Sequence, residues 1–273
     1  MAGPETRTAL ITGATDGLGR GLAGELADAG WTLLVHGRDE ARGAETVAEL
    51  AARGGDARFL RADLASLDEV RALADRVEAE TDRLDVLVSN AGIGFAGNGQ
   101  DHRVTSAEGH ELRFAVNYLA GYLLVRRLLP LLRRSAPARI VNVSSAGQSA
   151  LDFDDVMLER SYTGVQAYCQ SKLAQVMFTY DLAEELEGTG VTATALHPAT
   201  FMPTKMVLEA GISPTSELEV GVAATLRLVA DPELEGVSGV YFDRQRPAEP
   251  HSQARDRVAR AQLRSLSDRL CGL

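Results

Sequence analysis

Tyr168 and Lys172 stand four residues apart in the segment YCQSK. On a helix, residues at this spacing share a face, so the lysine ammonium would lie near the phenol. A nearby ammonium favours the phenolate, and moving the pKa of a tyrosine from about 10 toward 7 requires about 4 kcal/mol of such stabilisation. The pair therefore predicts a tyrosine that exchanges a proton near neutral pH. The alternative is an ordinary helix with a buried tyrosine and a lysine that reaches toward solvent.

Ser144 and Ser145 stand at the end of an apolar segment, 138–144. A hydroxyl at the carboxyl edge of a sheet can donate to a carbonyl oxygen and stabilise the negative charge that develops there. Asn117 lies in a helical pattern, FAVNYLA, where asparagine is unfavourable by propensity. We expect these residues at one reaction centre, and for Asn117 the alternative is a polar residue on a helix face.

Gly13, Gly17 and Gly19 follow an apolar segment at 8–12 and precede a helical pattern at about 19–29. Without a Cβ, the backbone can turn tightly and approach a pyrophosphate. The helix N-terminus then presents free N–H groups and the positive end of its dipole to that anion. The arrangement predicts a dinucleotide site, against the alternative of a glycine-rich turn without a ligand.

The end of the second apolar segment, 32–36, predicts which dinucleotide binds. An NAD site usually carries an acidic residue there to hold the ribose 2′-hydroxyl. This chain has Arg38, whose fork of donors suits a 2′-phosphate, with His36 as a polar neighbour. Asp39 lies just beyond and is interpreted as a helix cap. The pattern favours NADP(H) over NAD, and a solvated loop arginine is the alternative for Arg38.

Short apolar segments alternate with longer amphipathic ones, a pattern typical of βαβ units. The fold class that this predicts is α/β: a Rossmann-type, doubly wound, parallel sheet of about seven strands with helices on both faces, in one domain spanning 1–273. Expected strands are 8–12, 32–36, 57–61, 84–89, 138–144, 191–197 and 240–242. Expected helices are about 19–29, 39–53, 67–80, 111–134, 167–187 and 216–230, with a polar linker and a terminal helix in 244–273. Three loops would border a substrate, at about 93–109, 146–166 and 198–216.

The composition argues against several classes of protein. A net charge of −10 repels phosphate backbones, so nucleic acid is not an expected partner. Two cysteines, Cys169 and Cys271, form no disulfide framework, and no CxxC or HExxH pattern predicts a metal site. The first residues lack a signal-peptide pattern, and the apolar stretch at 114–132 contains Asn117 and two arginines, so no membrane span is expected. These features favour a cytoplasmic protein.

Three further motifs follow the TGxxxGxG glycine turn in order: SNAG at 89–92, VSS at 143–145 and YCQSK at 168–172. With them, the chain resembles the short-chain dehydrogenase/reductase family over about residues 8–242. AYCQSKLA and ALHP resemble the retinol-dehydrogenase-like branch of that family.

The resemblance implies hydride transfer between a nicotinamide and a carbonyl carbon. Tyr168 would be the general acid or base, and Lys172 together with an oxidised nicotinamide ring would lower its pKa. Lys172 would also bind the nicotinamide ribose, Asn117 would hold a water, and Ser145 would polarise the substrate oxygen, with Ser144 as the runner-up. Asp63 with Leu64 would contact the adenine. The expected cofactor-binding residues are Gly13, Thr15, Asp16, Gly17, Leu18, Gly19, Gly37, Arg38, Asp63, Leu64, Asn90, Ala91, Gly92, Tyr168, Lys172, Pro198 and Thr200.

The chain departs from the family pattern at three places. Ser89 replaces the first asparagine of Asn-Asn-Ala-Gly, a mild change. Pro198-Ala199 replaces Pro-Gly, and Pro203 stands where the family has a threonine, which puts the anchoring of the nicotinamide in doubt. The interval between Ser145 and the catalytic tyrosine is longer than the family's shortest form because of a DFDD segment.

The expected pocket is apolar and adaptable, because methionine and phenylalanine are frequent in the three loops. Its candidate walls, some of which could instead pack the loops, are Ile93, Phe95, Phe153, Met157, Phe201, Met202, Met206 and Val207. We expect a lipophilic carbonyl or alcohol substrate, such as a retinoid, steroid, fatty compound or polyketide, and by resemblance a homodimer or homotetramer. The alternatives are an NAD-dependent alcohol dehydrogenase and a non-catalytic NADP-binding sensor on the same fold.

Overall fold

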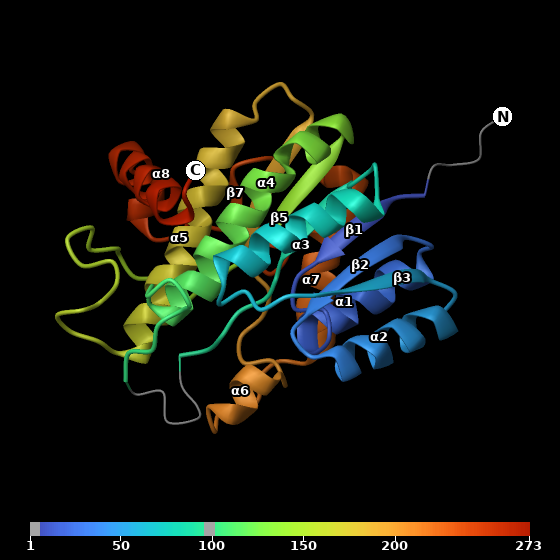
Figure 1. The fold of residues 1–273 in the computed structure, drawn as a ribbon, viewed down its shortest axis with the longest axis horizontal. Helices are drawn as coiled ribbons and strands as arrows, with labels where there is room; N and C mark the ends of the chain where they lie inside the picture. The colour runs from blue at the N-terminus through green and yellow to red at the C-terminus, as the bar shows by residue number, and fades with distance from the viewer. Residues whose placement is uncertain (1–5, 96–101) are drawn as a thin grey trace.

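The computed structural model describes residues 6–95 and 102–273, so part of the expected loop at 93–109 lies outside the described residues. All eight strands belong to one sheet, in the order β3-β2-β1-β4-β5-β6-β7-β8 (Figure 1). The first seven are parallel, as predicted, and β8 adds a short antiparallel edge. The strands are β1 Thr8–Ile11, β2 Thr32–Gly37, β3 Asp56–Arg61, β4 Val86–Ser89, β5 Ala138–Val143, β6 Val191–His197, β7 Val240–Asp243 and β8 Arg246–Pro247.

Helices cover both faces of the sheet, as the alternation predicts (Figure 1). The helices are α1 Gly17–Asp28, α2 Glu40–Ala52, α3 Leu67–Glu80, α4 Ala120–Arg134, α5 Gly164–Glu185, α6 Lys205–Glu209, α7 Leu218–Ala230 and α8 Arg257–Cys271. One apolar core lies under α3, α4 and α5, and a second lies under α1 and α7. Strands buried on both faces explain why the sequence shows continuous apolar runs rather than alternation.

The strand order reverses between β1 and β4, because the chain winds outward from β1 in both directions. The parallel register brings the carboxyl ends of β1, β4, β5 and β6 to one edge of the sheet. In doubly wound folds, ligands bind in the crevice at this reversal. The glycine turn, the SNAG motif and the two serines all follow strands that end there.

Several elements differ from the expectation. The helix predicted at 111–134 begins as a π-helix, Phe114–Leu119, before α4, and the loop 198–216 contains the short helix α6. Helix α5 begins at Gly164, before the predicted start, because the Thr163 hydroxyl accepts the N–H of Gln166 at 3.1 Å. This Thr-x-x-Gln spacing matches a capping box, a signal that the sequence did contain.

The C-terminal helix α8 packs against α5 (Figure 1) and also reaches α4, where the Tyr122 hydroxyl donates to Asp268 Oδ1 at 2.5 Å. Tyr118 and Ser267 join their hydroxyls at 2.7 Å, and Arg264 pairs with Asp181 at 3.1 Å. The chain itself therefore covers part of the outer surface of α4 and α5. Within 6–95 and 102–273, no helix has the length and apolar composition needed to cross a membrane.

Candidate functional site at the carboxyl edge of the sheet

The turn after β1 has no room for a side chain at its glycine positions. Gly13 and Gly17 have φ of +65° and +48°, in the left-handed region that favours glycine. A Cβ on Gly19 would lie 2.4 Å from the Gly13 oxygen and 2.6 Å from Asn90 Nδ2. That amide donates to the carbonyls of Thr12 and Gly13 at 2.8 and 3.1 Å, which binds the turn to the end of β4. The turn therefore fits a pyrophosphate at the N-terminus of α1.

His36 supports this turn from beneath. Its Nδ1 accepts the N–H of Gly13 at 3.2 Å, so Nε2 carries the proton and donates to the Ala62 carbonyl at 3.1 Å. The ring is 2% exposed, and burial lowers its pKa to about 4. The expectation that His36 neighbours the ribose phosphate is wrong, because both ring nitrogens are used on backbone groups.

This burial predicts an acid-sensitive fold. The folded protein binds the His36 proton only near pH 4, whereas an unfolded histidine binds it near 6.5. The stabilising contribution is therefore complete above about pH 6.5 and is lost as the pH falls toward 4, by about 3 kcal/mol in total. We expect chemical denaturation to show a steeper loss of unfolding free energy between these values in the wild type than in His36→Asn. Equal slopes would contradict the assignment, since other groups contribute to both proteins alike.

The expected ribose end lies where β2 stops. Arg38 is exposed in the bend after β2, and Asp39 Oδ1 caps α2 by accepting the N–H of Arg42 at 3.1 Å. A Cβ on Gly37 would lie 2.6 Å from the Thr15 methyl, so this glycine lets the phosphate turn approach the strand end. Sequence reasoning did not select Arg42, whose guanidinium lies 3.6 Å from Asp16 at the same turn. Two arginines thus border the place expected for a 2′-phosphate.

Asp63 and Leu64, the residues expected at the adenine, follow β3. Asp63 Oδ1 accepts the N–H of Ala65 at 3.0 Å, and the Leu64 side chain is buried in the core beneath α3. Contact with an adenine would therefore fall to Asp63 and the backbone rather than to the Leu64 side chain.

The two serines after β5 point to different places. Ser144 is 4% exposed, and its hydroxyl donates to the Lys172 carbonyl at 2.7 Å. Ser145 Oγ accepts the N–H of Gly147 at 3.0 Å, and a Cβ on Gly147 would lie 3.5 Å from Ser145 Oγ and 3.8 Å from the Tyr168 ring, so the hydroxyl lies near the tyrosine. The geometry therefore favours Ser145 for contact with a substrate oxygen and leaves Ser144 a structural role.

Lys172 lies beside Tyr168, with Nζ 5.7 Å from the ring centroid. Nζ donates to the Val143 carbonyl at 2.9 Å and to Gln175 Oε1 at 3.0 Å, and burial lowers its pKa to about 7. Burial also raises the pKa of Tyr168, although the hydrogen bond with Ser145 lowers it in part. With protein groups alone the phenol thus keeps its proton at neutral pH. The expected acidification depends on an oxidised nicotinamide ring as well as on the lysine, so it stays a prediction.

Asn117 lies in the π-helix and faces the loop after β4. Its Oδ1 accepts the N–H of Ile93 at 2.8 Å, and its Nδ2 donates to the Ile93 carbonyl at 3.1 Å and to Ser171 at 3.0 Å. Single π turns inside helices are frequent at functional sites. The side chain therefore holds the SNAG loop beside the reaction centre, and its expected water stays a prediction.

The loop after β6 returns to the glycine turn. Pro198 is buried, and Thr200 shares a hydrogen bond with His197 Nε2 at 3.0 Å. A Cβ on Gly17 would lie 3.0 Å from the methyl of Thr204, which places Thr204 over the turn. Thr204 is not among the expected cofactor residues. The sequence held one signal for it, because Thr204 directly follows Pro203, which stands where the family has a threonine.

The expected pocket walls divide between the site and the core. Phe95 meets the Tyr168 ring edge-on at 5.7 Å, and Met206 lies against Gly94. Met202 is instead buried in the core beneath α7. Two others are partly buried against the core beneath α5: Phe153 and Met157.

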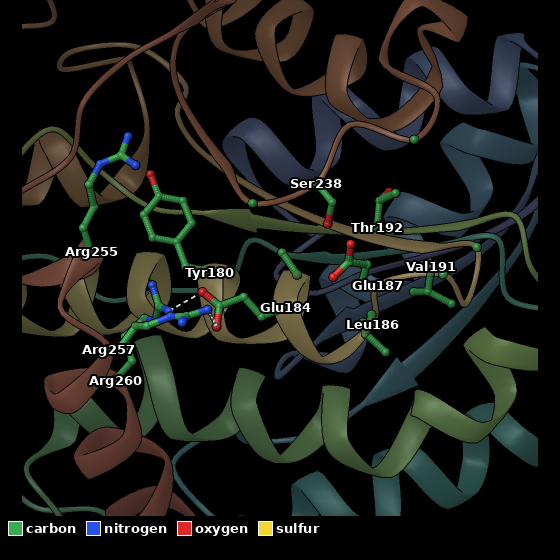
Figure 2. Close-up of a pocket in the computed structure, with 15 residues that line it drawn as sticks. Tyr180, Glu184, Leu186, Glu187, Val191, Thr192, Ser238, Arg255, Arg257 and Arg260 are labelled. Carbon is green, nitrogen blue, oxygen red and sulfur yellow. Dashed lines mark hydrogen bonds and ion pairs between the residues drawn. The ribbon is translucent and has the colours of Figure 1, made fainter.

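A hollow of about 650 Å³ lies elsewhere, where β6 begins and α5 ends (Figure 2). None of the predicted site residues lines it. Its arginines are already paired, Arg257 and Arg260 with Glu184, and Arg255 with Glu249. The hollow is at the amino end of the strands, opposite the edge where the candidate residues gather.

The chain matches a family model described as short chain dehydrogenase over residues 7–212. It is 37% identical over 289 residues to human Retinol dehydrogenase 13, covering 98% of this chain and 85% of that protein. It is 36% identical to human Retinol dehydrogenase 14, covering 98% and 87%. The RhlG/NADP active-site complex of Pseudomonas aeruginosa has a TM-score of 0.71 at 30% identity, covering 87% of this chain and 94% of that one.

The family match spans most of the fold, including β1 with its glycine turn and the helix that carries Tyr168. The retinol dehydrogenases align along nearly the whole chain. This chain therefore belongs to the short-chain dehydrogenase family, in its retinol-dehydrogenase-like branch, and is an NAD(P)-dependent oxidoreductase.

Proposed function

We propose that the protein is an NADP(H)-dependent ketoreductase or aldehyde reductase for lipophilic carbonyl compounds. The observation that carries the proposal is the convergence of Tyr168, Ser145 and Lys172 at the edge of the sheet where the glycine turn also lies, with Phe95 against the tyrosine ring. The glycine turn fits a pyrophosphate because it is tightly wound at the N-terminus of α1, where a Cβ at Gly19 would clash with the Gly13 oxygen. A proton donor, an oxygen-polarising hydroxyl and an apolar wall then lie together at one edge of the sheet.

Tyr168 is the proposed general acid. Bound NADPH would supply a hydride to the carbonyl carbon. The Tyr168 hydroxyl gives its proton to the carbonyl oxygen, and the Ser145 hydroxyl donates a hydrogen bond to the same oxygen. The Lys172 ammonium stabilises the phenolate that remains until solvent returns the proton. Reduction is the proposed working direction because cells usually hold NADP(H) in its reduced form.

Arg38 is the proposed determinant of NADP(H) preference. Charge-assisted hydrogen bonds contribute about 1.5–3 kcal/mol, so Arg38→Leu should weaken NADPH binding by about tenfold to a hundredfold and leave NADH binding unchanged. Calorimetric titration of both cofactors measures this ratio, with Arg133→Leu at the far end of α4 as the control. Equal affinity of the wild type for NADPH and NADH would overturn the proposal in favour of an NAD-dependent alcohol dehydrogenase.

The proposed substrates are lipophilic aldehydes and ketones. Two aligned relatives are named retinol dehydrogenases, and Phe95 and Met206 present apolar groups near the tyrosine. The test is a screen of NADPH oxidation across retinal, steroid ketones, fatty aldehydes and aromatic polyketides. Tight NADPH binding without turnover of any of them, or of the matching alcohols with NADP⁺, would favour the sensor alternative.

We also propose a cytoplasmic location, which the free thiols of Cys169 and Cys271 support. A homodimer or homotetramer stays a prediction. Light scattering on the purified chain measures the oligomeric state.

A further inference from the structure

Gln175 lies one helical turn after Lys172 on α5 and shares its buried environment. The two side chains are 4% and 3% exposed, and Gln175 Oε1 accepts a hydrogen bond from Lys172 Nζ at 3.0 Å. Lys172 Nζ also donates to the carbonyl of Val143, at the end of β5, at 2.9 Å. That carbonyl belongs to the backbone, so Gln175 is the acceptor that a substitution can change.

The geometry of an ammonium group makes this contact informative. Lys172 Nζ has three N–H donors, and two of them point to Val143 and Gln175. Two fixed acceptors set the direction of the third N–H. Lys172 Nζ lies close to Gly92 and Asn117 of the candidate site, because a Cβ on Gly92 would lie 3.7 Å from Nζ and 3.2 Å from Asn117 Oδ1.

We propose that Gln175 is a positioning residue that orients the Lys172 ammonium toward Tyr168 and the cofactor ribose and stabilises its charged form. The inference rests on the proposed function, since it gives Lys172 its task. A neutral amide suits the role because it accepts a hydrogen bond without adding a negative charge that would oppose the phenolate. A carboxylate at this position would bind the ammonium more strongly and work against proton transfer.

The titratable groups around the lysine are neutral at pH 7. Tyr168 and Cys169 lie on α5, and Tyr241 of β7 donates its hydroxyl to the Ser145 carbonyl at 3.0 Å. Burial raises the pKa of all three. The lysine itself is shifted by burial to a pKa of about 7. Its charge near neutral pH should therefore be sensitive to the loss or strengthening of one acceptor.

The chain allows a direct measurement, because it has two lysines, Lys172 and Lys205. Protein labelled with ¹³C at the lysine ε carbon gives two lysine signals, which Lys205→Arg assigns. Gln175→Met should lower the titration midpoint of Lys172 by about one pH unit, and Gln175→Glu should raise it by at least about one unit. Lys205, half-exposed and 3.5 Å from Glu209, should not change. Thr225→Val, which removes a buried hydrogen bond in α7, is the control for a purely structural loss.

Kinetics give the second measurement. If the charged lysine is needed for reduction, the alkaline limb of kcat should move to lower pH in Gln175→Met and to higher pH in Gln175→Glu, while the KM for the carbonyl stays within about twofold. Midpoints of Lys172 that move by less than about 0.3 unit in both variants would overturn the inference. Failure of the proposed function gives a different result from failure of this inference. Activity retained by Tyr168→Phe would rule out Tyr168 as the proton donor, whereas the effect of Gln175 on the Lys172 titration is measured without any turnover.

Discussion

Tyr168→Phe should abolish carbonyl reduction while NADPH affinity stays within about twofold of the wild type. The change removes one oxygen, the proposed proton donor. The ring keeps its edge contact with Phe95, and Ser145 keeps the N–H of Gly147. A positioned general acid contributes about 10²–10⁴-fold to a rate, so we expect kcat to fall by at least about 10²-fold. The measurement is NADPH oxidation with the best substrate from the carbonyl screen, beside calorimetric titration of NADPH.

Tyr118→Phe is the matched control for this experiment. Tyr118 is fully buried, and its hydroxyl contacts Ser267 of α8 rather than the reaction centre. Removing that hydroxyl should cost stability of about 1 kcal/mol and leave kcat unchanged. If Tyr168→Phe retained more than about a tenth of the wild-type kcat, Tyr168 could not be the proton donor.

Gly19→Ala should remove cofactor binding. The new methyl group would lie 2.4 Å from the Gly13 oxygen and 2.6 Å from Asn90 Nδ2, so either the turn or the end of β4 must move. Overpacking of this kind costs about 1–3 kcal/mol of stability. The displaced backbone would no longer present its N–H groups to the pyrophosphate, and we expect the Kd for NADPH to rise at least about 100-fold.

The control for the glycine substitution is Gly121→Ala in α4. A Cβ there would meet Ser89 Oγ at 3.4 Å, an ordinary contact, and alanine has the better helix propensity. Denaturation and NADPH titration should leave Gly121→Ala unchanged or slightly more stable. Wild-type NADPH affinity in Gly19→Ala would show that the pyrophosphate does not lie on this turn.

Much of the fold could be predicted because its signals are local. Apolar runs of strand length matched β2, β3 and β6 to within one residue, and Asp39 capped the expected helix. The two-residue strand β8 and the short helix α6 were not predicted, because so few residues show no hydrophobic periodicity. The π-helix around Asn117 was not predicted for another reason. Its shifted register accompanies an amide held by the backbone of Ile93, a residue distant in sequence.

The sequence by itself determined the element order, the glycine turn and the four-residue spacing of Tyr168 and Lys172, because each depends on neighbours along the chain. Tertiary structure decided what each polar group contacts. Both nitrogens of His36 bond backbone groups. Ser145 rather than Ser144 lies near the tyrosine, and a carbonyl of β5 lies beside Lys172. It also decided the pKa values, because the loss of water around a side chain depends on which strands and helices pack over it.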